Sequence, residues 1–182
     1  MLCKTAGIVL NYIKFRETSI IVKIYTEEFG LQTYIENGVR SSKSKGKIAL
    51  FQPLTILDLV VYHKNGKDIQ RISELKCSRP FYSIPTDIKK TTLGIFVAEM
   101  LNITIKEHTE NAVLFEFLVD ALEFLENHEE QIENFHLFFL IGLSNYLGFG
   151  PQNVKDIKVQ LLEFGKVTSE ESELVLQKVI EG

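Results

Sequence analysis

The sequence has few of the features that mark membrane, secreted or zinc-binding proteins. No apolar run reaches the roughly 20 residues that a membrane-spanning helix needs, and the N-terminus lacks the charged-then-apolar pattern of a secretion signal. The only two cysteines are Cys3 and Cys77, which fits a reducing compartment and does not by itself supply a zinc site. We therefore expect a cytoplasmic, nucleoid-associated protein with no membrane partner.

Patterns that would indicate catalysis are also missing. The sequence contains no phosphate-binding glycine loop of the Walker type and no nucleophile elbow, and its four histidines are scattered. Glu116, Asp120 and Glu123 share one face of a predicted helix, which leaves a metal-dependent nuclease as a hypothesis. Without interleaved histidines, a solvated acidic face is the better interpretation. We expect no enzyme activity, no cofactor and no metal.

Charge is distributed unevenly along the 182 residues. Residues 1–80 carry 13 lysines and arginines against 7 acids, a net charge of +6. Residues 81–182 carry 7 against 17, a net charge of −10. A basic half joined to an acidic half predicts two modules with different partners, the first of which binds nucleic acid.

The basic half is organised around a polar run, residues 38–47. This run has glycines near both ends, four cations and no acid, and it should be solvated and mobile. Arg40 ranks first as a phosphate ligand because its guanidinium can contact phosphate with two N–H groups. The DNA-binding candidates are Arg40, Lys43, Lys45 and Lys47 in this loop, Lys14 and Arg16 in an earlier connector, and Lys23 on a strand. The alternative for each lysine is an ordinary solvated side chain.

Period-2 alternation predicts five strands before residue 80, at about 4–13, 18–26, 31–37, 54–63 and 68–77. Asn65-Gly66 is a strong hairpin signal between the last two. Five short strands predict a small antiparallel barrel of the OB-fold type, although an SH3-like barrel has a similar strand count. Its aromatics Tyr12, Phe15, Tyr25 and Tyr34 could stack on bases, but most barrel aromatics belong to the core.

Two prolines in residues 78–85 end the strand pattern, and helical periodicity follows. We expect helices at about 87–104, from a cap at Thr109, and at about 129–147, with two shorter ones at about 154–163 and 169–181. The predicted fold class is therefore α+β. An OB-fold domain over residues 1–80 precedes an all-α domain for protein interactions over residues 81–182.

Several short segments stand in a fixed order and spacing along the chain: Gly7–Leu10, Glu17–Val22, Thr26 with Gly30, Gly38–Arg40 with the following Ser-Lys run, Phe51–Leu54, Ile72–Glu74 and Leu147–Phe149. Taken together, they resemble the N-terminal and central parts of the bacterial RecO family of recombination mediators. The resemblance covers roughly residues 1–153. Many members carry a four-cysteine zinc module in their later part, and this chain has no cysteine after Cys77.

The resemblance implies a repair mediator that binds single- and double-stranded DNA and anneals complementary strands. It also implies help in loading RecA onto DNA coated by single-strand-binding protein (SSB), together with RecR. RecR and the acidic C-terminal tail of SSB are thus the implied protein partners. The alternative is a protein-interaction scaffold of the same pathway that has little DNA binding of its own.

Overall fold

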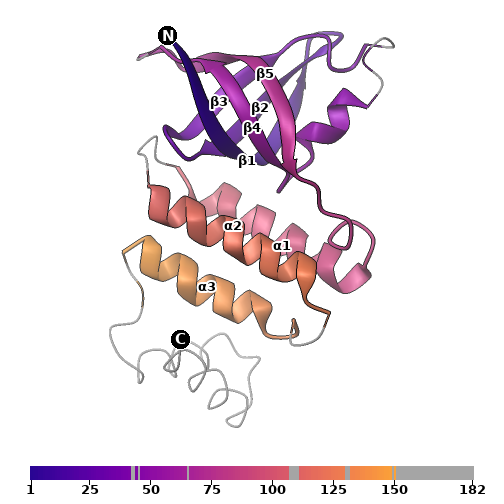
Figure 1. Cartoon of the computed structure of the whole chain (residues 1–182), viewed down its shortest axis with the longest axis vertical. Helices are drawn as coiled ribbons and strands as arrows, with labels where there is room; N and C mark the ends of the chain where they lie inside the picture. The colour runs from indigo at the N-terminus through magenta and orange to yellow at the C-terminus, as the bar shows by residue number, and fades with distance from the viewer. Residues whose placement is uncertain are drawn as a thin grey trace. The chain divides into compact units, whose positions relative to one another are not determined.

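The computed structural model describes residues 1–41, 44, 46–64, 66–106, 111–129, 132–148 and 150. Its first part is a closed five-stranded barrel with the strand order β1-β2-β3-β5-β4 (Figure 1). The strands are β1 (Leu2–Phe15), β2 (Ser19–Thr26), β3 (Gly30–Glu36), β4 (Ile56–Tyr62) and β5 (Ile69–Arg79). The predicted OB-fold barrel followed by helices is confirmed.

One strand pairing differs from the expected antiparallel pattern. β3 and β5 are parallel over a short stretch, where Thr33 lies opposite Ile69 and Ile35 lies opposite Arg71. The other four pairings are antiparallel. The reason is topological, because β4 runs antiparallel to β1 and the β4–β5 hairpin then reverses the chain. β5 therefore returns in the direction of β3 and closes the barrel.

Alternating residues of the strands fill the barrel with apolar side chains. A short 3₁₀ helix, η2 (Lys47–Phe51), begins at the end of the polar loop at residues 38–47. It places Phe51 in this core with no exposed surface. The sequence pattern predicts no helix between the strands at about 31–37 and 54–63. The buried core consists of Val9, Ile20, Val22, Ile24, Tyr34, Val39, Phe51, Leu57, Leu59 and Val61.

Within the described residues, three helices follow the barrel, close to where periodicity predicted them. α1 (Ile88–Thr104) begins after Asp87, whose side chain accepts a hydrogen bond from the backbone N–H of Lys90 at 3.0 Å. α2 (Ala112–Asn127) begins after Asn111, whereas the predicted cap, Thr109, lies outside the described residues. α3 (Phe135–Tyr146) is shorter than the predicted 129–147. The two short helices predicted after residue 153 also fall outside the described residues.

Residues Met1–His128 form one compact unit, which contains the barrel, α1 and α2, and Glu129–Gly182 belong to a second. In the first unit, Asn102 of α1 donates a hydrogen bond from Nδ2 to the carbonyl oxygen of Leu10 in β1, at 3.2 Å. The Tyr25 hydroxyl of β2 donates to the carbonyl oxygen of Asn111 at 3.4 Å. The domain boundary at residue 81 stays a prediction.

The segment between β5 and α1 is fastened to the C-terminal turn of α2. The Glu126 carboxylate accepts hydrogen bonds from the backbone N–H groups of Tyr82, Ser83 and Ile84, at 2.7, 2.9 and 3.0 Å. The ammonium of Lys90, which is only 3% exposed, donates to the Glu126 carbonyl oxygen at 2.6 Å and to the Ser83 hydroxyl at 2.8 Å. We call Ser83, Lys90 and Glu126 the linker clasp.

Within the part of the chain that the structure describes, no helix is both long and apolar enough to cross a membrane.

Candidate nucleic-acid interface

The turn between β1 and β2 presents an exposed guanidinium at one end of the barrel. Arg16 has a left-handed backbone conformation with φ of 52°, which is uncommon for a residue with a side chain. Its guanidinium carbon lies 5.2 Å from the centre of the Phe15 ring, a cation–π contact that favours one side-chain direction. The contact with Phe15 of β1 therefore sets the direction of the Arg16 side chain, and the guanidinium remains exposed to solvent.

Arg40 comes from a distant part of the chain and is attached to the same turn. Its backbone N–H donates to the Thr18 carbonyl oxygen at 2.9 Å, and its Nη1 donates to the Arg16 carbonyl oxygen at 3.2 Å. The neighbouring Val39 is buried in the core and anchors the backbone at this point. Two arginines that are 24 residues apart in sequence thus meet at one end of the barrel. Among the described residues, the other guanidinium N–H groups of Arg40 have no hydrogen-bond acceptor and can bond to a phosphate.

Two of the predicted lysines extend this positive surface along the β1–β2 hairpin. Lys14 is exposed and lies opposite Ile20 in the strand register, next to the turn. Lys23 is exposed on β2, between Asn11 of β1 and Thr33 of β3. Neither lysine has an ion pair among the described residues. Both ammonium groups therefore remain accessible to a phosphate.

The lysines of the loop at residues 38–47 do not extend this positive surface in the same way. Lys47 forms an ion pair with Glu36 at 2.6 Å, and the Glu36 side chain is only 12% exposed. A positive charge that is matched at this distance attracts a phosphate less than a free one. Lys43 and Lys45 lie outside the described residues. Of the two described cations in this loop, Lys47 is in an ion pair and Arg40 is not.

Most of the aromatic side chains considered for base stacking are packed inside the protein. Tyr34 has no exposed surface, and Tyr25 is 2% exposed beside Phe115 of α2. Burial raises the pKa of the Tyr25 hydroxyl to about 12 and also raises the pKa of the Tyr34 hydroxyl. Tyr12 is partly buried against the core. Only Phe15, which lies under Arg16, remains close to the predicted phosphate ligands.

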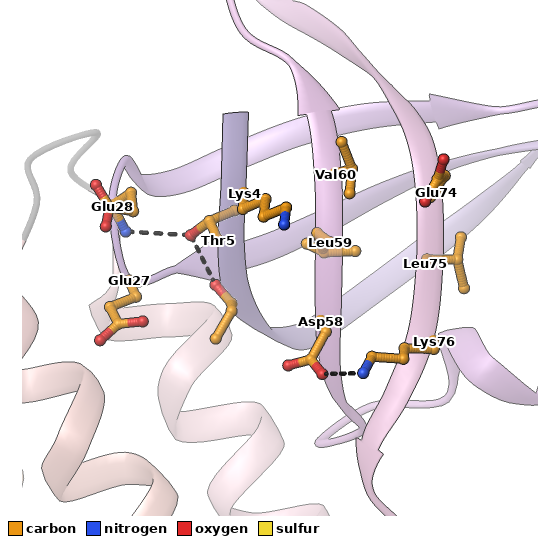
Figure 2. A pocket seen from close by; sticks show the side chains of 11 residues that line it. Lys4, Thr5, Glu27, Glu28, Asp58, Leu59, Val60, Glu74, Leu75 and Lys76 are labelled. Carbon is orange, nitrogen blue, oxygen red and sulfur yellow. Dashed lines mark hydrogen bonds and ion pairs between the residues drawn. The ribbon is translucent and has the colours of Figure 1, made fainter. Parts of the chain in front are cut away.

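Another side of the barrel has the opposite charge. A groove of about 610 Å³ over β1, β4 and β5 is lined by the carboxylates of Glu27, Glu28, Asp58 and Glu74 and by two lysines (Figure 2). One of these lysines, Lys76, is already paired with Asp58 at 3.1 Å, and this hydrogen bond holds the pKa of Asp58 below its ordinary value. The groove should therefore repel a phosphate backbone.

The carboxylates that suggested a nuclease are not assembled into a metal site. Glu123 of α2 is engaged in an ion pair with Arg79 at the end of β5. Over the described residues, no group of three or more histidine, cysteine or acidic side chains is close enough to share a metal ion.

Comparison with known proteins gives the chain a family. Residues 1–81 match the model described as "Recombination protein O N terminal", and residues 85–169 match "Recombination protein O C terminal". The chain is 45% identical to DNA repair protein RecO of Flavobacterium psychrophilum over 152 residues, which are 83% of this chain and 63% of that protein.

Two other relatives carry the same name. The RecO of Flavobacterium johnsoniae is 42% identical over 164 residues, which are 90% of this chain and 68% of that protein. The RecO of Bacteroides fragilis is 40% identical over 151 residues, which are 83% of this chain and 62% of that protein. The chain thus spans about two thirds of the length of the curated relatives that it matches. Its barrel, its helices and these matches together show that the chain belongs to the RecO family.

Proposed function

We propose that this chain works in DNA repair and recombination by binding DNA through its barrel, without catalysing a reaction. The observation that carries the proposal is the convergence of Arg16 and Arg40 at one end of the barrel, with Lys14 and Lys23 exposed nearby. Relatives named DNA repair protein RecO support the biological setting. An OB-fold barrel is also a common scaffold for single strands.

These contacts are suited to the DNA backbone more than to the bases. Arginine and lysine neutralise phosphates and release the counterions condensed on DNA. Four such contacts to a single strand would give a slope of about −3 for log affinity against log salt concentration. Because Tyr25 and Tyr34 are buried and Tyr12 is partly buried, stacking on these side chains adds little, and little sequence preference is expected. Binding of both single- and double-stranded DNA follows from recognition of the backbone alone.

The finer role belongs to the same proposal. A protein that binds two single strands through their phosphates reduces the repulsion between them, which supports annealing of complementary strands. By its family, the chain would further help to load RecA onto single strands coated by SSB. RecR and the acidic C-terminal tail of SSB are the proposed partners in that step.

A charge-removal experiment tests the DNA contacts. The double variant Arg16→Ser/Arg40→Ser should bind a fluorescent single strand more weakly, with a salt slope less negative by about 1.4, because each lost contact removes about 0.7. The control is Lys4→Ser/Lys89→Ser, which removes two exposed charges elsewhere, in the acidic groove and on α1. Equal affinity and slope for both double variants would contradict the proposal.

A protein-interaction scaffold is the second candidate, and α1 gives it a specific observation. Ile88, Ile95 and Ile103 lie on one stripe of this helix and are 82, 62 and 59% exposed. Exposed isoleucines at helical spacing are typical of a surface that docks another protein. Retention of RecR by the chain, together with no DNA binding at low salt, would favour this candidate over the first.

A further inference from the structure

The acidic groove over β1, β4 and β5 has no role in the DNA-binding proposal. Among the residues that the structure describes, Glu27, Glu28 and Glu74 are exposed and have no ion pair, whereas Asp58 is paired with Lys76. The four carboxylates and two ammonium groups that line the groove leave it with a net charge of −2. The groove therefore offers unpaired carboxylates to a positively charged partner.

Hydrogen bonds to β1 hold two of these acids at one edge of the groove. The backbone N–H of Glu27 donates to the Ala6 carbonyl oxygen at 3.1 Å, and that of Glu28 donates to the Thr5 hydroxyl at 3.3 Å. Thr5 is 7% exposed, and its hydroxyl donates in turn to the Ala6 carbonyl oxygen at 3.0 Å. Figure 2 shows Glu27 and Glu28 on one side of the groove and Glu74 on the other. The backbone of this acidic turn is thus already ordered, which reduces the entropy lost when a partner binds.

The unpaired arginines of the barrel lie at the other end of β2. This strand of 8 residues begins shortly after Arg16 and ends directly before Glu27. Its length separates the two turns by about 25 Å, which is beyond the Debye length of about 10 Å at 0.1 M salt. We call Lys14, Arg16 and Arg40 the basic end. Within one molecule, the basic end and the acidic groove therefore do not neutralise each other.

The basic end is complementary to the groove in charge. Its three cations and the exposed acid Glu17 have a net charge of +2, against −2 in the groove. Arginine can contact a carboxylate with two parallel N–H groups. Apolar surface is present on both sides as well, because Ile13 beside the basic end is 62% exposed and Ala6 and Val60 line the groove. Two surfaces of this chain thus offer matched contacts that a single molecule cannot make with itself.

We propose that the acidic groove binds the basic end of a second copy of this chain, so that copies associate head to tail. In this contact, the carboxylates of Glu27 and Glu28 accept hydrogen bonds from the guanidinium groups of Arg16 and Arg40 of the second copy. Because two different surfaces meet, the contact is heterologous and can continue through further copies. The association itself does not require DNA.

A consequence for DNA binding follows from the shared arginines. Arg16 and Arg40 are also the proposed phosphate ligands, so a bound strand and a second copy exclude each other. The association therefore forms in the absence of DNA and is dispersed by it. This release, unlike the association, rests on the proposed function.

Sedimentation velocity of the whole chain without DNA tests the contact. At low salt the weight-average sedimentation coefficient should rise with protein concentration, and at about 1 M salt, where the Debye length is about 3 Å, the chain should be monomeric. Glu27→Gln/Glu28→Gln should weaken the association about tenfold, because two charged contacts are lost. The matched control, Glu116→Gln/Asp120→Asn, neutralises two exposed acids on α2 and should associate as the unchanged protein does.

A mixture of two variants tests the head-to-tail geometry. Arg16→Ser/Arg40→Ser keeps the groove but lacks the basic end, and Glu27→Gln/Glu28→Gln has the converse defect. Each variant alone should associate weakly, whereas the mixture should form a complex of one copy of each that does not grow, because only one matched contact remains. A mixture that associates no better than either variant alone overturns the proposal. So does an unchanged protein that stays monomeric at low salt, or a groove variant that associates like the control.

Addition of a thymidine oligonucleotide separates this inference from the proposed function. The oligonucleotide should disperse the assembly to monomers at the concentrations at which it binds the chain in anisotropy titrations. Bound DNA that leaves the assembly intact overturns the shared use of Arg16 and Arg40. An assembly that forms although the chain binds no DNA overturns the proposed function and leaves the head-to-tail contact standing.

Discussion

The linker clasp should contribute measurably to stability. Glu126→Ala removes the acceptor of the backbone N–H groups of Tyr82, Ser83 and Ile84. Hydrogen bonds to a charged group are worth about 1.5–3 kcal/mol each in net terms. Two of the three N–H groups belong to residues with some solvent exposure and can bond to water after the change, whereas Ile84 is 8% exposed. We therefore expect a loss of about 2 kcal/mol in the free energy of unfolding.

Urea unfolding followed by circular dichroism measures this loss. The matched control is Glu116→Ala, which removes an exposed carboxylate from the same helix and should change stability by less than about 0.5 kcal/mol. A Glu126→Ala variant as stable as the control would refute the idea that the clasp fastens the linker to α2.

The pH dependence gives an independent check on the same group. Burial by itself would raise the pKa of Glu126, but the N–H donors of Ser83, Ile84 and Tyr82 outweigh it and lower the pKa below the ordinary 4.5. The stability that this carboxylate supplies is therefore complete above pH 4.5 and is lost as the pH falls through the folded-state pKa. The stability difference between the unchanged protein and Glu126→Gln should shrink below pH 4.5. A difference that grows in acid would contradict the assignment.

Three further changes have defined outcomes. Gly7→Ala would place a Cβ 2.6 Å from Cγ2 of Ile24, so we expect a loss of about 1–3 kcal/mol in unfolding free energy, and an unchanged urea midpoint would count against this close packing. Phe51→Ala leaves a cavity at a fully buried position and should lower the unfolding free energy by about 3–5 kcal/mol in the same urea measurement. A loss below about 1 kcal/mol would mean that Phe51 does not contribute to the packing of the barrel core. Arg40→Ser should weaken DNA binding in anisotropy titrations more than Lys47→Ser, because the ion pair of Lys47 already matches its charge, and the reverse order would contradict this ranking.

Much of the fold could be predicted from sequence because its signals are local. Alternation of apolar residues identified all five strands, and Asn65-Gly66 indicated the turn before β5. The parallel contact between Thr33 and Ile69 had no local signal, because it depends on how the whole barrel closes. The 3₁₀ helix that buries Phe51 was missed for a similar reason, since five residues are too few to show a helical period.

The candidate site was predictable in composition but not in arrangement. Counting cations found Arg16 and Arg40, yet their hydrogen-bonded association across 24 residues of sequence is a tertiary contact. The pairing of Lys47 with Glu36 is equally invisible in the sequence, although both residues were in view. Composition therefore counts Lys47 as a free cation and does not show that Glu36 already pairs with it.

The measurement that tests the central claim most directly is the salt dependence of binding to a labelled single strand, followed by fluorescence anisotropy with the whole chain. A barrel that uses about four cations to bind phosphates predicts a log–log slope of about −3. Double-stranded DNA should bind with a similar dependence. No binding at low salt, or an affinity that salt does not change, would contradict the claim that this barrel recognises DNA by its phosphates.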